Sequence, residues 1–455
     1  MTASTADALR HAPLTRVLRA LALGETSSEA LTAACLDAID GENVRLRAWT
    51  HVDADGALSA ARASDARRAQ CRPLGRLDGV PLAVQDNLDV AGLPTGLGLP
   101  GPAPVAAEDA HAVTRLRGAG AVILGKTALD EAAFGTLGRN PHHGDVRNPR
   151  FPGKACGGAS AGAAAAVAAG HASAAIGSDT LGAIRIPAAF CGLAGLRPTF
   201  GEIGCRGLAP ALRRLDSVGV LARAVADIAP LLQVMAGYDP GDPRSRMRRT
   251  PFALPDWQPG TLRVGVVRGL EALGVQDGVI DAFERAVARA AAGLGSLHAI
   301  DLDLAPLEIA ATRRAALLLM EAEILAAHGD RLAGCSPRLR GLLAFAEGKR
   351  AVDYAVADRR LDAHVVRMRL LFERVDVLLL PTVSAPPPDF GAEEPSNLAD
   401  LSALASLAGC PALSLPLGDG IGLQLVGARG SDLRLLELGQ ILACVIDAGG
   451  WERGR

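Results

Sequence analysis

The chain has 455 residues, a hydrophobic fraction of 49 %, and a formal net charge of −2 from 47 basic and 49 acidic side chains. Such a length can bury a large core without disulfides, and the balanced charge gives no electrostatic reason to expect binding to nucleic acid or to an anionic membrane. Aromatic residues make up only 3 %, which also argues against a protein that stacks nucleic-acid bases.

The first residues and the cysteines indicate where the protein works. Residues 1–18 carry charged side chains and no apolar stretch, so they do not resemble a secretory signal. The most apolar run, residues 163–176, is too short to span a bilayer. The eight cysteines are scattered and include no Cys-x-x-Cys pair, which is typical of free thiols in a reducing compartment. These features predict a cytoplasmic protein without a metal site or a cofactor.

In the first half of the chain, alanine-rich stretches with apolar residues at helical spacing predict helices over residues 5–40 and 55–69. A buried strand over residues 80–84 ends in the polar sequence QDN. Residues dense in Gly, Pro, Asn and His predict a long loop over 135–158. The other elements expected here are a strand over 120–124, a helix opening at 125–127, a helix over 162–170, a strand over 174–177 and a helix beginning within 183–190.

The second half alternates strands and long helices in the same way. Apolar residues at 279, 283, 286, 287 and 290 mark one face of a helix that stops near Gly293. Interleaved strands and helices along the whole length predict an α/β fold. We expect one domain over residues 1–455, with a core at 60–235 and 375–445 and a variable helical half at about 235–400. The elements expected here are strands over 262–267, 300–304, 377–380, 412–415 and 422–426, and helices over 307–328, 350–373 and 431–445.

Two segments carry most of the functional information, residues 75–90 and residues 157–201. In the second, Gly157-Gly158 permit unusual backbone angles before a helix whose small residues permit close packing. Residues 178–182 (SDTLG) form a strand-to-helix turn, and backbone N–H groups in such a turn can bind an anion or an oxyanion. The pattern alone leaves two interpretations open: a glycine-rich ligand loop, or small residues that only permit close packing.

These segments resemble the amidase-signature family, the Ser–Ser–Lys amidohydrolases. The resemblance covers about residues 10–445. The family includes the A subunit of glutamyl-tRNA amidotransferase, which the chain also resembles, and the stretch NPHHGDVRNP at 140–149 favours the branch of the allophanate and carboxybiuret hydrolases. The resemblance implies the amidase-signature fold, in which a mixed, twisted central sheet carries helices on both faces. Further matching stretches lie at 125–127, 130–131, 215–223, 235–243 and 422–427.

The family that the chain resembles uses a lysine, a serine that follows a cis peptide bond, and a nucleophilic serine twenty-four residues later. The matching positions here hold Gln85, Ala159 and Ala183. A carboxamide is not a base near neutral pH, and a methyl group has neither a proton to relay nor a lone pair. The resemblance therefore implies an amidase homologue that lacks this chemistry, while the Gly158–Ala159 bond is still expected to be cis.

The resemblance also implies a substrate-binding turn, although one of its residues leaves the family pattern. Leu181 stands where the family usually has glycine. A side chain at this position narrows the site or tilts the turn. The residues expected to contact a ligand there are Asp179, Thr180, Leu181 and Gly182.

Several functional accounts stay open. The preferred one is a natural pseudoenzyme, kept to bind a small amide-like ligand or to serve as a scaffold beside an active amidase or a small partner subunit in amide or urea-nitrogen metabolism. A second is an active amide or urea-type hydrolase in which Cys156 or Ser160 is the nucleophile and Lys154 or His142-His143 the base. A laboratory variant inactivated by substitution and a binding module unrelated to amides are further alternatives. A homodimer also fits the resemblance.

Overall fold

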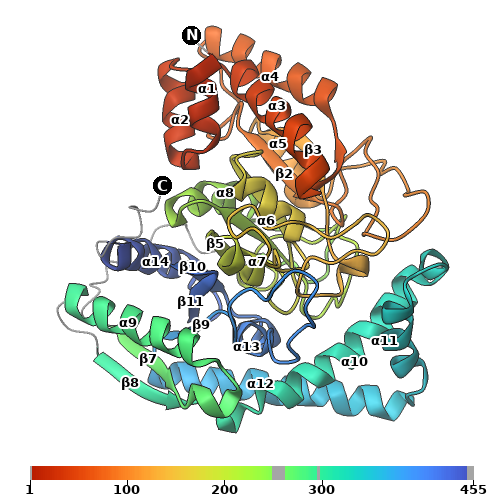
Figure 1. Ribbon diagram of the computed structural model, residues 1–455, viewed down its shortest axis with the longest axis vertical. Coiled ribbons are helices and arrows are strands. Elements are labelled where there is room, and N and C mark those ends of the chain that lie inside the picture. The colour runs from red at the N-terminus through yellow and green to blue at the C-terminus, as the bar shows by residue number, and fades with distance from the viewer. Residues whose placement is uncertain (1–2, 248–261, 295–297, 448–455) are drawn as a thin grey trace.

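The computed structural model describes residues 3–247, 262–294 and 298–447. Within these ranges, eleven strands form one continuous mixed sheet, which Figure 1 shows running through the molecule. The strands are β1 (Trp49–Val52), β2 (Pro81–Gln85), β3 (Val122–Thr127), β4 (Ala174–Asp179), β5 (Ala194–Arg197), β6 (Ser217–Ala222), β7 (Arg263–Arg268), β8 (His298–Asp303), β9 (Val377–Pro381), β10 (Ala412–Gly418) and β11 (Ile421–Gly427).

The order of the strands places two polar strand ends beside each other. The sheet runs β1-β3-β2-β4-β6-β5-β10-β11-β9-β7-β8. Strand β2 is parallel to both β3 and β4, with Val84 opposite Ile176. The carboxyl ends of parallel neighbours lie at the same edge of a sheet. The residues that follow Gln85 and Asp179 therefore come together.

Helices cover both faces of the sheet, as the fold expected from the resemblance requires. Leu82 and Val84 of β2 pack into one hydrophobic cluster, whereas Ala83 between them packs into another. This alternation is the two-residue period of a strand buried on both sides. The helices are α1 (Ala3–Arg10), α2 (Leu14–Leu23), α3 (Ser28–Leu46), α4 (Ala54–Ala69), α5 (His111–Gly118), α6 (Ala161–Ala168), α7 (Arg185–Phe190), α8 (Ile228–Met235), α9 (Asp277–Leu294), α10 (Ile309–His328), α11 (Pro337–Glu347), α12 (Ala351–Arg374), α13 (Asp400–Ala408) and α14 (Asp432–Asp447).

Three expectations about single elements are wrong. Residues 5–40 form three helices instead of one, because Pro13 precedes α2 and Gly24 ends it in the left-handed conformation, with φ of 67°. Residues 125–127 continue β3 and do not open a helix, since Lys126 pairs with both β1 and β2. From the sequence, no element is predicted at helices α5, α8, α11 and α13 or at strands β1, β5 and β6, all of which the structure contains.

Small residues let α6 pack tightly against neighbouring backbone, as the sequence predicts. A Cβ atom placed on Gly162 would lie 2.4 Å from the carbonyl oxygen of Ala48 and 2.5 Å from the nitrogen of Ala128. Only glycine fits at that position. In the loop before the helix, Gly157 has φ of 81°, which favours glycine as well.

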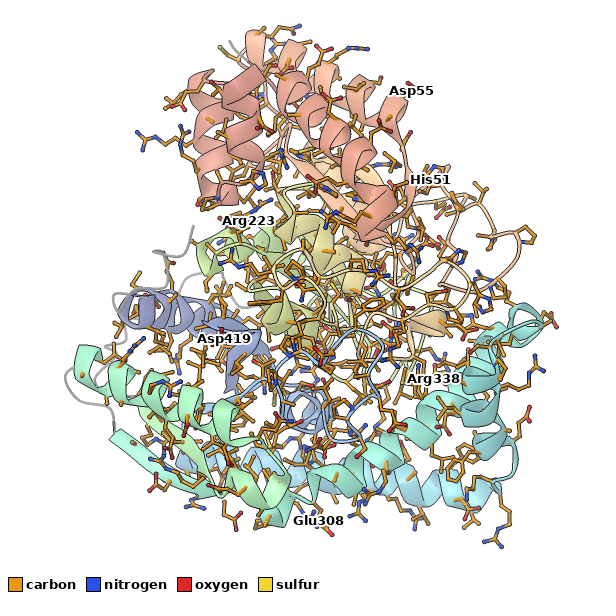
Figure 2. All side chains as sticks on the ribbon, in the orientation of Figure 1. His51, Asp55, Arg223, Glu308, Arg338 and Asp419 are labelled. Atoms are coloured by element: carbon orange, nitrogen blue, oxygen red, sulfur yellow. The ribbon has the colours of Figure 1, made fainter. Side chains whose placement is uncertain are left out.

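The outer surface of the helical region carries exposed ion pairs. Glu308, at the edge of the molecule, pairs with Arg360 and Arg367 of α12 (Figure 2). Arg338 lies instead where α11 approaches the central loops (Figure 2). In the described part of the chain, none of the helices is long and apolar enough to cross a membrane.

Candidate functional site

The end of β2 meets the entry to α6 through the side chain of Gln85. Its Oε1 atom accepts one hydrogen bond from the Ser160 hydroxyl and one from the Ser178 backbone N–H, each at 2.8 Å. The side chain is fully buried, and its Nε2 atom has no partner within the described residues. Beside it, Asn87 donates from Nδ2 to the Ser178 hydroxyl at 2.8 Å. Gln85 is thus an uncharged acceptor that joins three segments.

The two alanine positions adjoin this group. The Gly158–Ala159 peptide bond is cis, which confirms the expectation from the resemblance. The next residue, Ser160, donates its backbone N–H to the carbonyl oxygen of Ala183 at 3.1 Å. Because Ser160 also contacts Gln85, positions 85, 159 and 183 lie together. The convergence that the resemblance requires is therefore present.

Asp179, at the start of the turn, is held by buried cations. Arg185 donates to both of its carboxylate oxygens, at 2.8 and 2.9 Å, and Arg197 lies 3.5 Å from Oδ1. Burial by itself would raise the pKa of Asp179, but the charges and hydrogen bonds of these arginines lower it to about 2. Asp179 also accepts the N–H groups of Gly182 and Ile184. Asp179 thus stabilises the turn, in part through its hydrogen bond from the Gly182 N–H.

The other residues of the turn border a cavity. Thr180, Leu181 and Ala183 line it, and no acceptor within the described residues takes their backbone N–H groups. The Thr180 hydroxyl donates to Asp216 at 2.7 Å, so it is already engaged. Backbone N–H groups in a turn before a helix can bind a carbonyl oxygen or an oxyanion. Ligand contact at Thr180 and Leu181 stays a prediction that this geometry permits.

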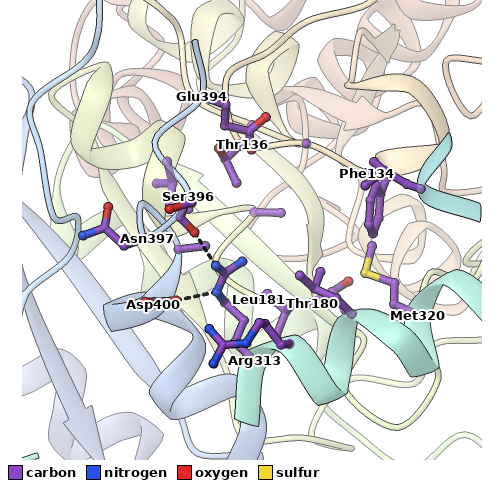
Figure 3. Close-up of a pocket in the computed structure, with 18 of the residues that line it drawn as sticks. Phe134, Thr136, Thr180, Leu181, Arg313, Met320, Glu394, Ser396, Asn397 and Asp400 are labelled. Carbon is purple, nitrogen blue, oxygen red and sulfur yellow. Dashed lines mark hydrogen bonds and ion pairs between the residues drawn. The ribbon is translucent and has the colours of Figure 1, made fainter. Parts of the chain in front are cut away.

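The cavity has a volume of about 640 Å³ and extends from the turn to the helical region (Figure 3). Its apolar wall includes Met320 of α10, which belongs to a buried hydrophobic cluster, and Phe134, Leu181 and Leu317, which pack against that cluster. This size and mixed lining are typical of small-molecule sites. The remaining lining comes from residues 133–136, Gly158, Ile186, residues 310–321 of α10, Arg338 and Leu342 of α11, and residues 394–400.

Most charged side chains of the cavity are paired within the protein. Arg313 donates to Asp400 and to the carbonyl oxygen of Ser396, as the dashed lines in Figure 3 mark. Arg338 pairs with Glu394, which also accepts a hydrogen bond from Thr136 at 2.6 Å. Sequence reasoning missed these residues. They lie on helices and loops that carry no motif, and only the helical spacing along 310–321 could have indicated a common face.

The alternative nucleophile and bases lie in other environments. The Cys156 thiol is fully buried, 3.4 Å from the Cys191 sulfur, and the hydrogen bond to Cys191 together with burial raises its pKa well above the usual value. A thiol with a raised pKa is a poor nucleophile. Lys154 forms an exposed ion pair with Asp389 at 2.7 Å. His142 contacts Glu131 at 2.7 Å, and His143 contacts the carbonyl oxygen of Leu99 at 3.1 Å.

The one buried lysine near the end of β2 serves the packing of this region. Lys126 contacts Asp86 at 3.0 Å and donates to the carbonyl oxygen of Pro94 at 2.9 Å. Burial lowers the pKa of Lys126, while the charge of Asp86 opposes that effect.

Across residues 3–247, 262–294 and 298–447, no group of three His, Cys, Asp or Glu side chains could hold a metal ion.

Comparisons with known proteins agree on one family. The model of the Amidase family matches residues 30–436. The chain is 35 % identical to the A subunit of the glutamyl-tRNA(Gln) amidotransferase from Chloroflexus aurantiacus, covering 95 % of this chain and 96 % of the relative. It is 37 % identical to the protein of the same name from Acidothermus cellulolyticus, covering 93 % and 92 %.

Solved structures give the same result for the fold. One is described as an unexpected vestigial protein complex that reveals the evolutionary origins of an s-triazine catabolic enzyme. It superimposes with a TM-score of 0.87 at 31 % identity, covering 95 % of this chain and 98 % of that one. A structure described as an amidase gives 0.85 at 32 %, with 95 % and 99 % covered. The expected fold class is confirmed.

Proposed function

The chain belongs to the amidase family, and we propose that within it this protein binds an amide-like ligand without hydrolysing it by Ser–Ser–Lys chemistry. The observation that carries the proposal is the group at positions 85, 159 and 183. A carboxamide occupies the position of the family's amine, and methyl groups occupy those of its two hydroxyls. A nucleophile needs a nearby base to activate it, and Gln85 supplies an amide instead.

The hydrogen bonds of Gln85 support a structural role for this side chain. Its Oε1 atom accepts the hydroxyl hydrogen of Ser160 and the backbone N–H of Ser178, so both donors are satisfied without a base. Removal of a comparable triad in serine proteases leaves only about 10³–10⁴-fold acceleration over water. The proposal therefore expects amide turnover far below that of an active amidase.

Binding is supported by what remains of the site. The N–H groups of Thr180, Leu181 and Ala183, which no described residue accepts, border a cavity of about 640 Å³, which suits the carbonyl oxygen of a small amide. The alternative in which Cys156 or Ser160 acts as nucleophile has less support. Cys156 is buried with a raised pKa, and Ser160 donates its hydroxyl hydrogen to an uncharged carboxamide.

A partner protein is the second part of the proposal. The sequence relatives are named as subunits, and one structural neighbour is described as part of a complex. Co-purification of the full chain with proteins encoded beside it tests this part. A strictly solitary chain at physiological concentration would contradict it.

Labelling with a fluorophosphonate probe tests the loss of chemistry. Intact-mass spectrometry of the purified chain is expected to show no adduct, whereas an active amidase treated in parallel is labelled on its serine. Release of ammonia from short alkyl amides is measured beside it. A covalent adduct on the native chain, or ammonia release at the rate of the active control, would overturn the proposal.

A further inference from the structure

One carboxylate at the cavity has no partner among the described residues. Glu321 of α10 borders the cavity and is only 5 % exposed, and its Oε2 atom makes no hydrogen bond within that part of the chain. Arg313 and Arg338, which border the same cavity, are each paired with an acidic side chain. Burying a charged carboxylate without a partner is costly. Burial accordingly raises the pKa of Glu321 to about 7.

The position of Glu321 on its helix places this carboxylate beside apolar side chains. Leu317 and Met320 precede it by four residues and one residue, and both line the cavity. Arg314, which also lines the cavity, lies seven residues earlier on the same helix. It is exposed and two helical turns away, about 10 Å along the axis. Arg314 forms no ion pair with Glu321 in the described part of the chain, and burial alone is the cause of the raised pKa of Glu321.

We propose that the cavity takes an amide that also carries a protonated amine, with the ammonium group against Glu321 and the apolar chain along Leu317 and Met320. The inference rests on the proposed function, which assigns the amide end to the turn at residues 180–183. An ammonium group supplies both the N–H donors and the positive charge that the Glu321 carboxylate lacks, and charge-assisted hydrogen bonds are the stronger class. A methyl or carboxylate end has no hydrogen to donate and would leave the carboxylate unpartnered.

Three matched amides test the proposal on the full-length protein. In 5-aminopentanamide, hexanamide and adipamate, the same four-methylene chain joins the amide to an ammonium, a methyl or a carboxylate group. Isothermal titration calorimetry at pH 8 keeps Glu321 ionised and the amine protonated. We expect 5-aminopentanamide to bind about tenfold more tightly than hexanamide, and adipamate to bind most weakly.

Substitutions assign that preference to one side chain. Glu321→Gln is expected to weaken binding of 5-aminopentanamide about tenfold and to change binding of hexanamide less than threefold. Glu347→Gln, an exposed position at the end of α11, is the matched control and should change neither affinity. If Glu321→Gln does not fold, the ranking of the three amides on the native chain decides the question.

The outcomes separate the two proposals. Equal binding of hexanamide and 5-aminopentanamide, or a preference that survives Glu321→Gln, would overturn this inference and leave the proposed function standing. Absence of binding by all three amides would overturn the inference and the ligand-binding role together. Rapid hydrolysis of 5-aminopentanamide with its preference intact would overturn only the proposed loss of catalysis.

Discussion

The Ser160 hydroxyl donates to Oε1 of Gln85 at 2.8 Å, and the same oxygen accepts the backbone N–H of Ser178. This acceptor joins the entry of α6 to the end of β4. A lysine ammonium has three donors and no acceptor, so it could not make either bond. The two neighbouring donors, the Ser160 hydroxyl and the Ser178 N–H, therefore suit a carboxamide at position 85.

Removing this acceptor should destabilise the protein. Gln85→Leu leaves the Ser178 N–H without its buried acceptor, and leaves the Ser160 hydroxyl only its longer contact, at 3.3 Å to the carbonyl oxygen of Ser178. We expect a loss of about 1–3 kcal/mol in the free energy of unfolding. Urea denaturation measures it. Gln70→Leu, at an exposed position after α4, is the control and should change stability by less than about 0.5 kcal/mol. Equal effects of the two substitutions would contradict the structural role of Gln85.

Restoring the family's side chains should restore reactivity. The triple variant Gln85→Lys, Ala159→Ser, Ala183→Ser is expected to react with a fluorophosphonate at position 183, because the three positions still converge. Ala183→Ser alone should stay unlabelled, since a hydroxyl without a base is a weak nucleophile. Peptide mapping by mass spectrometry identifies the residue that carries the probe. A folded triple variant that never reacts would show that convergence is not sufficient.

The buried ion pair between Arg185 and Asp179 should contribute more to the free energy of unfolding than an exposed ion pair does. Arg185 is fully buried and holds Asp179, so Arg185→Met leaves that carboxylate without its main partner and should cost about 3–5 kcal/mol. Arg213→Met breaks the pair with Glu323, in which the arginine side chain is 69 % exposed, and should cost less than about 1 kcal/mol. Denaturant unfolding compares both variants with the native chain. Similar losses in both would contradict this difference.

The carboxylate of Glu321 should make stability depend on pH in a defined direction. Its pKa rises from 4.5 to about 7 on folding, so the folded state binds the proton more tightly than the unfolded state. The destabilisation is absent below pH 4.5, grows as pH rises toward 7, and is constant above it. Glu321→Gln removes the charge and should stabilise the protein by about 3 kcal/mol at pH 8 and by almost nothing at pH 4.

Thermal unfolding of the native chain and Glu321→Gln across pH 4–8 measures this effect. Tyr354 on α12, whose pKa is raised by its own burial and by the charge of Glu321, is not ionised in that range. Glu347→Gln again serves as the control and should show no such trend. A stability gain that is the same at both ends of the range would contradict a buried Glu321 that ionises without a partner.

Predictions from the sequence succeeded where a short pattern repeats locally. The strands around Val84 and Ile176, and the small-residue helix that ends at Ala168, follow directly from burial and side-chain size. Predictions failed where hydrogen bonds to other strands decided the conformation of a segment. Strands β1 and β5 have only four residues each and owe their conformation, like β6, to neighbours across the sheet. Gly125–Thr127 continues a strand because partners lie on both sides.

The sequence by itself determined the family, the mixed α/β architecture and the presence of a carboxamide and two methyl groups at positions 85, 159 and 183. It also indicated the turn at residues 179–182. Only the tertiary structure decided that the Gln85 carboxamide is already bonded, that Asp179 supports the turn, and that Glu321 borders the same cavity without a partner among the described residues. The physical reason is that periodicity records which face of an element is buried. Which charges meet depends on segments that approach one another only in the folded chain.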